Sequence, residues 1–273
     1  MTPKLIAFDL DGTLLDTRKN LSERTRRALE AAGKAGALLV PATGRIPAGM
    51  PKPLLGLPGF RWGILSNGAE LYDFAEERIA AREEIPLETA LRVLDEAEAL
   101  GLSYDCYQDN WGYMTEDFLR RAPDYIADPG ILDLIRRLRT PVPELRAYLR
   151  EKGEPLQKLQ FYFTDQALRR RLLKELPGRW PTLSVTSSLP VNIELNSAAA
   201  NKGQALLTLC GLLGIDPADT IAFGDGGNDL SMLRAAGCGV AMANAEPEVK
   251  AAADRVTRTN DEDGVAAVLE ELF

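Results

Sequence analysis

The sequence predicts an α/β protein, built from a parallel-sheet core domain and a second α/β domain that is inserted into it. At both ends of the chain, short apolar runs alternate with segments of helical periodicity, which is typical of a parallel sheet covered by helices. In the middle, the runs come in pairs separated by tight turns, which is typical of antiparallel strands. The length of 273 residues also suits two lobes better than one compact core.

Buried strands of the parallel sheet are predicted from continuous apolar runs of about four residues, bounded by polar residues or glycine. Segments whose apolar residues recur with helical spacing lie between these runs. Two of them are well defined, at residues 22–34, where Ser22 is the expected N-cap, and at residues 202–213. The predicted core strands are 5–8, 38–40, 64–65, 221–223 and 239–242.

The inserted α/β domain is predicted to span residues 82–188, which assigns 1–81 and 189–273 to the core domain. Within the insert, the Asp-Asn pair at 109–110 has the residue types that two-residue hairpin turns prefer. We therefore expect an antiparallel hairpin there, and a second one around Pro190. The expected strands are 104–108, 111–115, 159–164, 183–187 and 191–195, and the expected helices are 87–100 and 166–176.

Composition excludes several classes of protein. The formal net charge is −8, and no basic run is dense enough to predict a nucleic-acid-binding face. No apolar run approaches the roughly 18 residues of a membrane span, and Asp9 comes before any apolar stretch of signal-peptide length. The three cysteines lack CxxC spacing, so we expect reduced thiols. These features predict a cytoplasmic protein with no nucleic-acid or membrane partner, and the lack of a long apolar surface stripe predicts a monomer.

The chain contains no histidine. This excludes the Ser-His-Asp and Cys-His catalytic arrangements, phosphohistidine intermediates and histidine-ligated zinc or iron. Any chemistry must therefore be carried by carboxylates, lysine, hydroxyl groups and a metal ion that prefers oxygen ligands.

Polar residues that can carry chemistry follow directly after the predicted core strands. Asp9 and Asp11 come after the first strand, Thr43 after the second and Asp225 after a later one, while Lys202 opens a helix. In an open parallel sheet, ligands bind beyond the carboxyl ends of the strands. We therefore expect these side chains to converge on one site.

The residue types at these positions predict a metal and phosphate site. Several carboxylates at one site repel one another, and a hard cation relieves the repulsion. Mg²⁺ suits such a set because it prefers oxygen ligands and keeps several waters. A cation in the first turn of a helix, as at Lys202, opposes the helix dipole, unless an anion such as phosphate lies in front of it. Taken singly, these residues have ordinary explanations as turns, caps or surface charges, so their combination carries the prediction.

The motifs lie at residues 9–13, 43–45, 201–203 and 224–229, with further patterns at 66–69, 239–245 and 259–265. In these motifs the sequence resembles the haloacid dehalogenase (HAD) superfamily, and within it the Cof-type sugar-phosphate phosphatases. The resemblance covers nearly the whole core domain and is weak within the insert. It implies a Rossmann-like core with a large C2-type cap, and an Mg²⁺-dependent phosphatase that forms an aspartyl-phosphate.

The resemblance also implies a role for each motif residue. Asp9 would be the nucleophile, and Asp11 the general acid and then the general base, with its carboxyl free because it would bind the metal through its backbone carbonyl. Asp9 and Asp225 would complete the metal ligands. Thr13 and Asp229 would lie behind these groups, with Asp229 orienting Lys202 or a metal-bound water. The residues expected to contact phosphate or substrate are Thr43, Gly44, Arg45, Asn67, Lys202 and Asn228.

The sequence leaves the substrate open. A small phosphorylated metabolite is expected, with sugar phosphates favoured over flavin mononucleotide, pyridoxal phosphate and erythrose phosphate, and the cap is expected to set the choice. A phosphomutase or another phosphotransferase could use the same motifs, and a non-catalytic metabolite-binding protein could keep the fold. The alternating aromatic residues of the cap are expected to pack its sheet on its helices rather than to line the substrate surface. They are Tyr107, Trp111, Tyr113, Phe161 and Tyr162.

Overall fold

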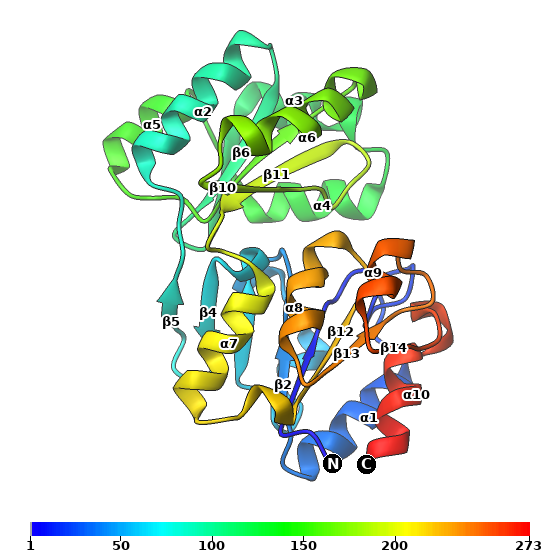
Figure 1. Ribbon diagram of the computed structural model, residues 1–273. Coiled ribbons are helices and arrows are strands. Elements are labelled where there is room, and N and C mark those ends of the chain that lie inside the picture. Colours follow the sequence, from blue (N-terminus) through cyan, green and yellow to red (C-terminus); the bar gives the residue numbers. More distant parts are fainter. Residues whose placement is uncertain (1) are drawn as a thin grey trace. The chain divides into compact units, whose positions relative to one another are not determined.

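The computed structural model describes residues 2–273, which divide into two compact units (Figure 1). The core unit comprises the N-terminal segment up to Arg45 together with Met50–Arg82 and Asn201–Phe273. The inserted unit comprises Ile46–Gly49 and Glu83–Ala200. Each unit has its own sheets and its own apolar core. No helix within residues 2–273 is long and apolar enough to cross a membrane.

A five-stranded sheet with all its strands parallel forms the centre of the core unit, in the order β14-β13-β12-β1-β2. The register places Leu5 beside Thr220 and beside Leu38. The predicted runs at 5–8, 38–40 and 221–223 fall on strands of this sheet, and the run at 239–242 does so except for Met242, which follows its strand. The strands are β1 (Leu5–Phe8), β2 (Leu38–Pro41), β12 (Thr220–Gly224), β13 (Cys238–Ala241) and β14 (Arg255–Val256).

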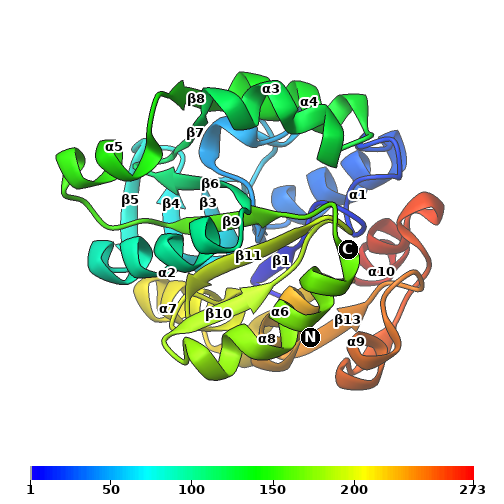
Figure 2. The same cartoon turned by 90° about the horizontal axis from the view of Figure 1, so that it is seen from above.

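Helices cover both faces of this sheet, as the view from above shows (Figure 2). Ile6 and Phe8 pack with helices α1 (Glu23–Lys34) and α10 (Gly264–Leu272). Leu5 and Ala7 point to the other face, where they pack with α7, α8 and α9. The alternation along β1 therefore buries both faces, which explains why this strand is a continuous apolar run. The three latter helices are α7 (Lys202–Leu213), α8 (Leu230–Ala235) and α9 (Pro247–Ala252).

The run at 64–65 was predicted as a strand of the parallel sheet, but among residues 2–273 it pairs in parallel at one point alone, the isolated bridge between Ile64 and Ala42 after β2. It lies in β3 (Trp62–Leu65), the first strand of an antiparallel sheet with β4 (Glu70–Asp73) and β5 (Arg78–Arg82). The reason is the tight turn after β3, where residues 66–68 all have positive φ angles of 49°, 61° and 100°. This turn sends the chain straight back, so β3 pairs with its sequence neighbour.

A six-stranded sheet forms the centre of the inserted unit, in the order β10-β11-β9-β6-β7-β8. All neighbours are antiparallel except β7 and β8. The strands are β6 (Ser103–Gln108), β7 (Trp111–Thr115), β8 (Arg139–Val142), β9 (Lys158–Tyr162), β10 (Leu183–Thr186) and β11 (Asn192–Ser197). The helices are α2 (Leu87–Ala99), α3 (Glu116–Tyr125), α4 (Pro129–Leu138), α5 (Leu145–Lys152) and α6 (Gln166–Arg179).

Both hairpins of the insert form where the sequence predicts them. Asp109 and Asn110 have φ angles of 49° and 59°, as a two-residue hairpin between β6 and β7 requires. The second hairpin joins β10 to β11. Because β11 also pairs with β9, the inserted unit extends to Ala200, whereas the predicted boundary lay at residue 188.

The aromatic residues of the insert divide between the two faces of its sheet. Phe161 belongs to the apolar core, and the Tyr113 ring lies 4.7 Å from the Tyr148 ring, so these two pack as predicted. Tyr107 and Tyr162 pack on helices as well, beside Leu138 of α4 and Phe118 of α3. In addition they bond to the buried charges Arg139 and Asp105, which the aromatic pattern did not predict. Trp111 donates its indole N–H to Thr140.

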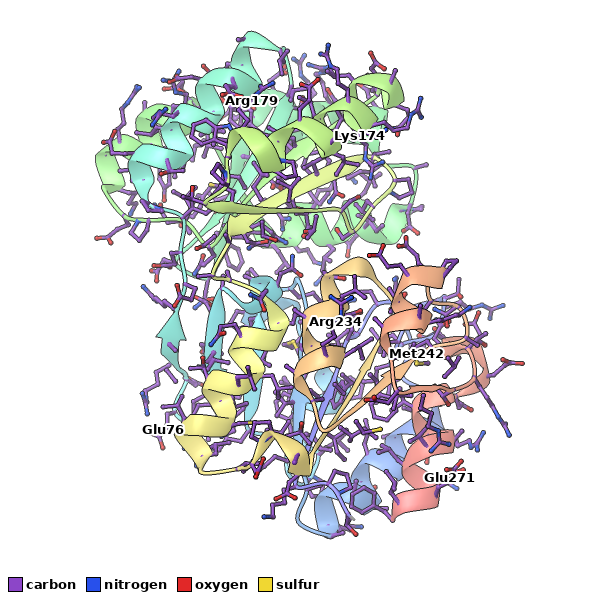
Figure 3. The ribbon with its side chains drawn as sticks, in the orientation of Figure 1. Glu76, Lys174, Arg179, Arg234, Met242 and Glu271 are labelled. Atoms are coloured by element: carbon purple, nitrogen blue, oxygen red, sulfur yellow. The ribbon has the colours of Figure 1, made fainter. Side chains whose placement is uncertain are left out.

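Figure 3 shows the side chains of both units, and two of those that it labels differ in their exposure to solvent. Met242, which follows β13, is completely buried in the core unit. Arg179, at the end of α6, instead pairs with Glu96 at 2.8 Å and with Glu175 at 3.1 Å, and all three side chains are partly exposed. Such exposed pairs contribute little to stability.

Candidate active site

The site lies within the core unit, at the carboxyl edge of its parallel sheet. Asp9 follows β1, Thr43 follows β2 and Asp225 follows β12, and these three strands are neighbours in the sheet. Lys202 is the first residue of α7, whose N-cap Asn201 accepts a hydrogen bond from the Gln204 amide at 2.8 Å. The order of the strands in the sheet thus brings together residues that are far apart in the sequence.

Lys202 bridges two aspartates in the interior of the site. Its Nζ lies 2.7 Å from Asp9 Oδ1 and 2.6 Å from Asp229 Oδ1, and its side chain has no exposed surface. Burial by itself lowers the pKa of Lys202, but the carboxylates of Asp229 and Asp9 raise it above the usual range. Lys202 is therefore a fixed positive charge beside Asp9.

Asp229 holds both Lys202 and the loop after β12. Its second oxygen accepts hydrogen bonds from the backbone amides of Asp225 and Gly226 at 3.0 and 2.9 Å. A Cβ atom at Gly224 would lie 2.4 Å from the Cβ of Asp229, so only glycine leaves room there. Asp229 therefore contacts Lys202 directly, as the first of the two roles that the motif implied for it would require.

Thr13 and Gly12 fit closely around Asp225. Thr13 Oγ1 donates to Asp225 Oδ1 at 2.6 Å. Gly12 has a φ angle of +92°, and a Cβ atom there would lie 2.4 Å from Asp225 Oδ2. The loop that follows Asp9 is thus in direct contact with Asp225.

The acidic residues lie close enough to hold one cation. Single carboxylate oxygens of Asp9, Asp225 and Asp229 all lie within 4.8 Å of one another. Burial raises the pKa of Asp9 to about 7, with a further contribution from Asp229 and an opposing one from Lys202. Burial also raises the pKa of Asp225 to about 6, against the Thr13 hydrogen bond. Three carboxylates and one ammonium group leave two negative charges, which fits a divalent cation with oxygen ligands.

The loops after β2 and β3 place the expected phosphate and substrate contacts near one another. The Thr43 carbonyl accepts from the Asn67 amide at 3.0 Å, and Asn67 Oδ1 accepts from Asn228 Nδ2 at 3.3 Å. A Cβ atom at Gly44 would meet Asn67 Oδ1 at 3.1 Å. These four residues, from three separate loops, are therefore brought together as predicted for one binding surface.

Asp11 differs from the expectation that its carboxyl would be free. Arg45 donates to it twice, from Nε at 3.0 Å and from Nη2 at 2.8 Å, and Lys19 Nζ lies 2.9 Å from Asp11 Oδ1. Although burial works in the other direction, the Arg45 and Lys19 charges hold the pKa of Asp11 below its usual value. In this arrangement Asp11 is an ionised carboxylate and Arg45 is its partner.

Lys19 and Asn244 belong to the site and were not predicted. Lys19 has a φ angle of 65°, in a turn closed by hydrogen bonds between Asp16 and Asn20. Asn244 Nδ2 donates to the Gly12 carbonyl at 2.8 Å. The polar turn residues at 16–20 signalled the first turn, but no local pattern shows which way either side chain points.

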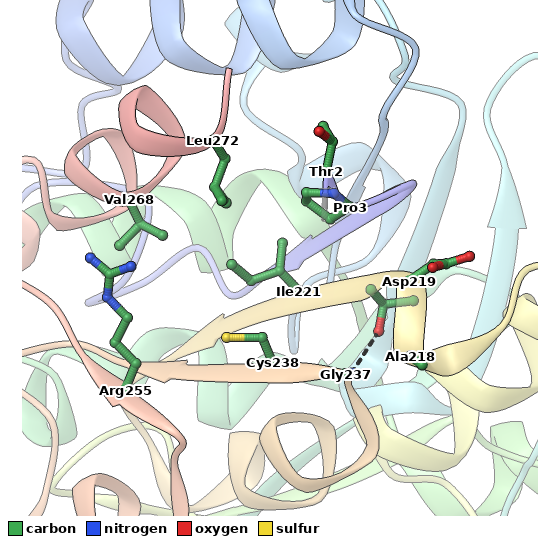
Figure 4. Close-up of a pocket in the computed structure, with 11 residues that line it drawn as sticks. Thr2, Pro3, Ala218, Asp219, Ile221, Gly237, Cys238, Arg255, Val268 and Leu272 are labelled. Carbon is green, nitrogen blue, oxygen red and sulfur yellow. Dashed lines mark hydrogen bonds between the residues drawn. The ribbon is translucent and has the colours of Figure 1, made fainter.

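A separate cavity of about 270 Å³ lies in the core unit, away from these residues (Figure 4). It is at the opposite edge of the sheet, because Thr220 and Cys238 are the first residues of their strands. Its charged residues have partners outside the cavity lining, since Asp219 pairs with Lys4 and Arg255 with Glu271. None of the predicted site residues lines it. The lining residues are Thr2, Pro3, Ala218, Asp219, Thr220, Ile221, Gly237, Cys238, Arg255, Val268 and Leu272.

Comparison with known proteins decides the family. The sequence model of the haloacid dehalogenase-like hydrolases matches residues 6–269. This chain is a haloacid dehalogenase-like hydrolase. The hydrolase is 34% identical to the phosphatase YwpJ of Bacillus subtilis (strain 168), with 99% of this chain and 100% of YwpJ covered.

Two further relatives carry names that include a substrate. The hydrolase is 30% identical to the 5-amino-6-(5-phospho-D-ribitylamino)uracil phosphatase YcsE of Bacillus subtilis (strain 168), over 97% of this chain and 94% of YcsE. It superposes on the solved structure of the HAD subclass IIB sugar phosphatase BT4131 with a TM-score of 0.78 and 26% identity, over 98% of each chain. The hydrolase is therefore an enzyme of the phosphatase class, and the family resemblance is confirmed.

Proposed function

We propose that this phosphatase hydrolyses small phosphomonoesters, with sugar phosphates favoured, through an aspartyl-phosphate on Asp9 and with Mg²⁺ as cofactor. The observation that carries the proposal is the buried contact of Lys202 with both Asp9 and Asp229. The carboxylate that we propose as the nucleophile thus lies beside a positive charge, at the edge of a parallel sheet where ligands typically bind.

The donor set fits Mg²⁺. Asp9 and Asp225 would hold it through their carboxylates and Asp11 through its backbone carbonyl, while Asp229 is engaged with Lys202. When bound, the metal would neutralise negative charge on the carboxylates and on the phosphoryl oxygens. Burial raises the pKa values of Asp9 and Asp225, and the Asp229 charge adds to both shifts, so a bound cation would favour the ionised carboxylates.

The proposed reaction has two steps. Asp9 attacks phosphorus, the bond from phosphorus to the leaving oxygen breaks, and Asp11 gives that oxygen a proton. Asp11 then takes a proton from water, the water oxygen attacks phosphorus, and the bond to Asp9 breaks to release phosphate. Lys202 stays charged throughout and balances the negative charge of the transferred group.

Asp11 has to change its partners for this role. As long as Arg45 and Lys19 bind its carboxylate, the ionised form is favoured and no proton is available for a leaving group. We propose that the phosphorylated substrate draws Arg45 towards itself. Thr43, Gly44, Asn67 and Asn228 would then surround the phosphate.

Sugar-like phosphomonoesters are the favoured substrates because two of the similar proteins are named a 5-amino-6-(5-phospho-D-ribitylamino)uracil phosphatase and a sugar phosphatase, although a third is named a pyridoxal phosphate phosphatase. One face of the insert's sheet carries polar side chains, among them Asp105, Gln160 and Glu194, but all three are buried and have partners within the unit. The choice of sugar phosphates therefore rests on the relatives alone. Flavin mononucleotide, pyridoxal phosphate and erythrose phosphate remain in the test panel.

The test is phosphate release from this panel, with Mg²⁺ and with a chelator, for the wild type, Asp9→Asn and the control Asp124→Asn. Asp124 is an exposed aspartate on α3. We expect magnesium-dependent release from the wild type and the control, and none from Asp9→Asn. Release that is indifferent to Asp9 contradicts the mechanism, and transfer of phosphate to a second sugar without release would indicate a phosphotransferase.

A further inference from the structure

Asn244 ties the loop that follows the nucleophile to the C-terminal part of the core unit. Its Nδ2 donates to the Gly12 carbonyl at 2.8 Å, and its Oδ1 accepts from the backbone amide of Asn260 at 3.0 Å. Asn244 lies outside every strand and helix. Its amide group therefore joins two loops that are distant in sequence.

The C-terminal loop fastens the same segment at three further points. Asn260 Nδ2 donates to the Leu15 carbonyl at 2.9 Å. Asp261 accepts from the Thr17 amide at 2.7 Å and from the Thr17 hydroxyl at 2.6 Å. Asp263 accepts from the Ser22 hydroxyl at 2.5 Å, and Ser22 is the N-cap of α1. We call Asn244 together with residues 260–263 the C-terminal clamp.

The C-terminal clamp holds the carbonyl of Gly12, a glycine that lies against Asp225. Gly12 has a left-handed φ of +92° and approaches the Asp225 carboxylate too closely for any side chain. Its flanking residues are Asp11, whose carbonyl is a proposed metal ligand, and Thr13, which donates to Asp225. A bond to the Gly12 carbonyl therefore fixes the peptide between two groups of the proposed metal site.

We propose that Asn244 is a positioning residue for the metal site, which it aligns by holding the Gly12 carbonyl. The inference rests on the proposed function, because it assumes that the site binds Mg²⁺. Partners that orient metal ligands without touching the metal typically change metal affinity by about 10- to 100-fold when they are removed.

Asn244→Asp isolates this contact. The substitution keeps an oxygen that can accept from the Asn260 amide, but it replaces the donor that faces the Gly12 carbonyl with a second acceptor. It also adds a negative charge near the site, and by Coulomb attraction alone this charge would tighten the binding of Mg²⁺. Loss of the positioning contact thus predicts weaker Mg²⁺ binding, whereas the added charge alone predicts tighter binding.

The experiment measures Mg²⁺ binding to the full chain without substrate, by titration calorimetry, and then kcat and KM against Mg²⁺ concentration. Besides Asn244→Asp, it uses the uncharged variant Asn244→Ser and the charge control Asn20→Asp. Asn20 is exposed on the same loop, and its side chain donates to Asp16. Thermal unfolding of each variant shows whether it is folded.

We expect Asn244→Asp to weaken Mg²⁺ binding about tenfold and Asn244→Ser to weaken it less, with kcat restored at saturating Mg²⁺ and KM for the ester unchanged. Asn20→Asp should leave the binding constant unchanged or tighten it. Equal or tighter binding by both Asn244 variants overturns the inference and leaves the proposed function standing. A wild type that releases phosphate but binds no Mg²⁺ overturns the magnesium proposal and the inference together.

Discussion

Lys202 shows how one buried side chain organises the site. It neutralises Asp9 and is held in turn by Asp229, and all three residues are buried. A buried charge without a partner is costly, whereas one that is paired and hydrogen-bonded is tolerated. The same pairing that stabilises the fold therefore keeps a positive charge where the phosphoryl group would arrive.

Lys202→Met removes this charge and leaves two carboxylates facing each other. We expect the free energy of unfolding to fall by about 3 kcal/mol and kcat to fall by at least about a hundredfold. Chemical denaturation and phosphate release measure the two effects. Lys174→Met, a substitution on α6 in the inserted unit, serves as the control and should change neither quantity, and a fully active Lys202→Met enzyme would contradict the role of Lys202.

Gly12→Ala tests the contact of the loop with Asp225. A matched control exists, because Gly36 has a similar φ of +97° but has open space where a Cβ atom would lie. Both substitutions should lower stability by about 1–2 kcal/mol through the left-handed backbone. Only Gly12→Ala should also abolish phosphate release and weaken Mg²⁺ binding, because only its methyl group displaces Asp225. Equal activity in both variants would show that the close approach of Gly12 to Asp225 is not needed for phosphate release.

The sequence predicts most of the residues that the structure brings together at this edge of the sheet, because each motif lies directly after a strand or at the start of a helix. Asp9, Thr43 and Asp225 could be placed together from the order of parallel strands alone. The partners of Asp11 could not, since Arg45 and Lys19 reach it from two different loops. The direction of a side chain on a loop depends on backbone angles such as the positive φ of Lys19, and these have no regular signature in the sequence.

At the scale of single elements, the polar face of the inserted sheet depends on Asp105 in β6. Its oxygens accept from Arg139 Nε and Gln160 Nε2, both at 2.9 Å, and from the Tyr162 hydroxyl at 3.2 Å. Asp105 and Arg139 are both buried. Since Arg139 lies on β8 and both Gln160 and Tyr162 lie on β9, one side chain links three strands of the sheet.

Asp105→Asn keeps the size of the side chain but leaves the Arg139 charge without its carboxylate. We expect a loss of about 3 kcal/mol or more in the free energy of unfolding. Asp133→Asn breaks an exposed pair with Arg137 on α4 and should cost less than about 1 kcal/mol. Denaturant titrations of both variants check the difference, and equal losses would mean that the Asp105 network adds no stability.

Elements with local signals were predicted well, and elements defined by distant partners were not. Ser22 caps α1, with its hydroxyl accepting from the Thr25 amide, and the turn at 109–110 forms because its residues accept positive φ. Helix α3 contains Pro123, and its irregular pattern was not recognised. The run at 64–65 is equally apolar in a parallel or an antiparallel sheet, so its pairing with β4 follows only from the turn after it.

At the scale of the whole molecule, metal binding and pH should be linked to stability. Folding raises the pKa of Asp9 to about 7 and of Asp225 to about 6, so the native protein without metal holds protons that the unfolded chain has lost. Its stability should therefore fall as the pH rises from about 4 to about 7. Because Mg²⁺ bound at the proposed site would displace those protons, its stabilising effect should grow over the same interval.

Thermal unfolding at pH 5.5 and pH 8, with Mg²⁺ and with a chelator, checks this linkage. At a Mg²⁺ concentration of about 100 times Kd the gain in stability is about 2.7 kcal/mol, and we expect the larger gain at pH 8. Asp225→Asn should reduce the gain at both pH values. A gain that is larger at pH 5.5 would contradict the assignment of these carboxylates as metal ligands.

The order of β1 and β12 has a consequence for the synthesis of the chain. β1 pairs with β12 on one side, yet the whole inserted unit lies between these two strands in the sequence. On the ribosome, β1 therefore emerges long before its partner, and one of its edges stays open while the insert is translated. The main part of the insert is continuous from Glu83 to Ala200, so it can fold first. A chaperone that shields β1 in this interval would act before any enzyme activity exists.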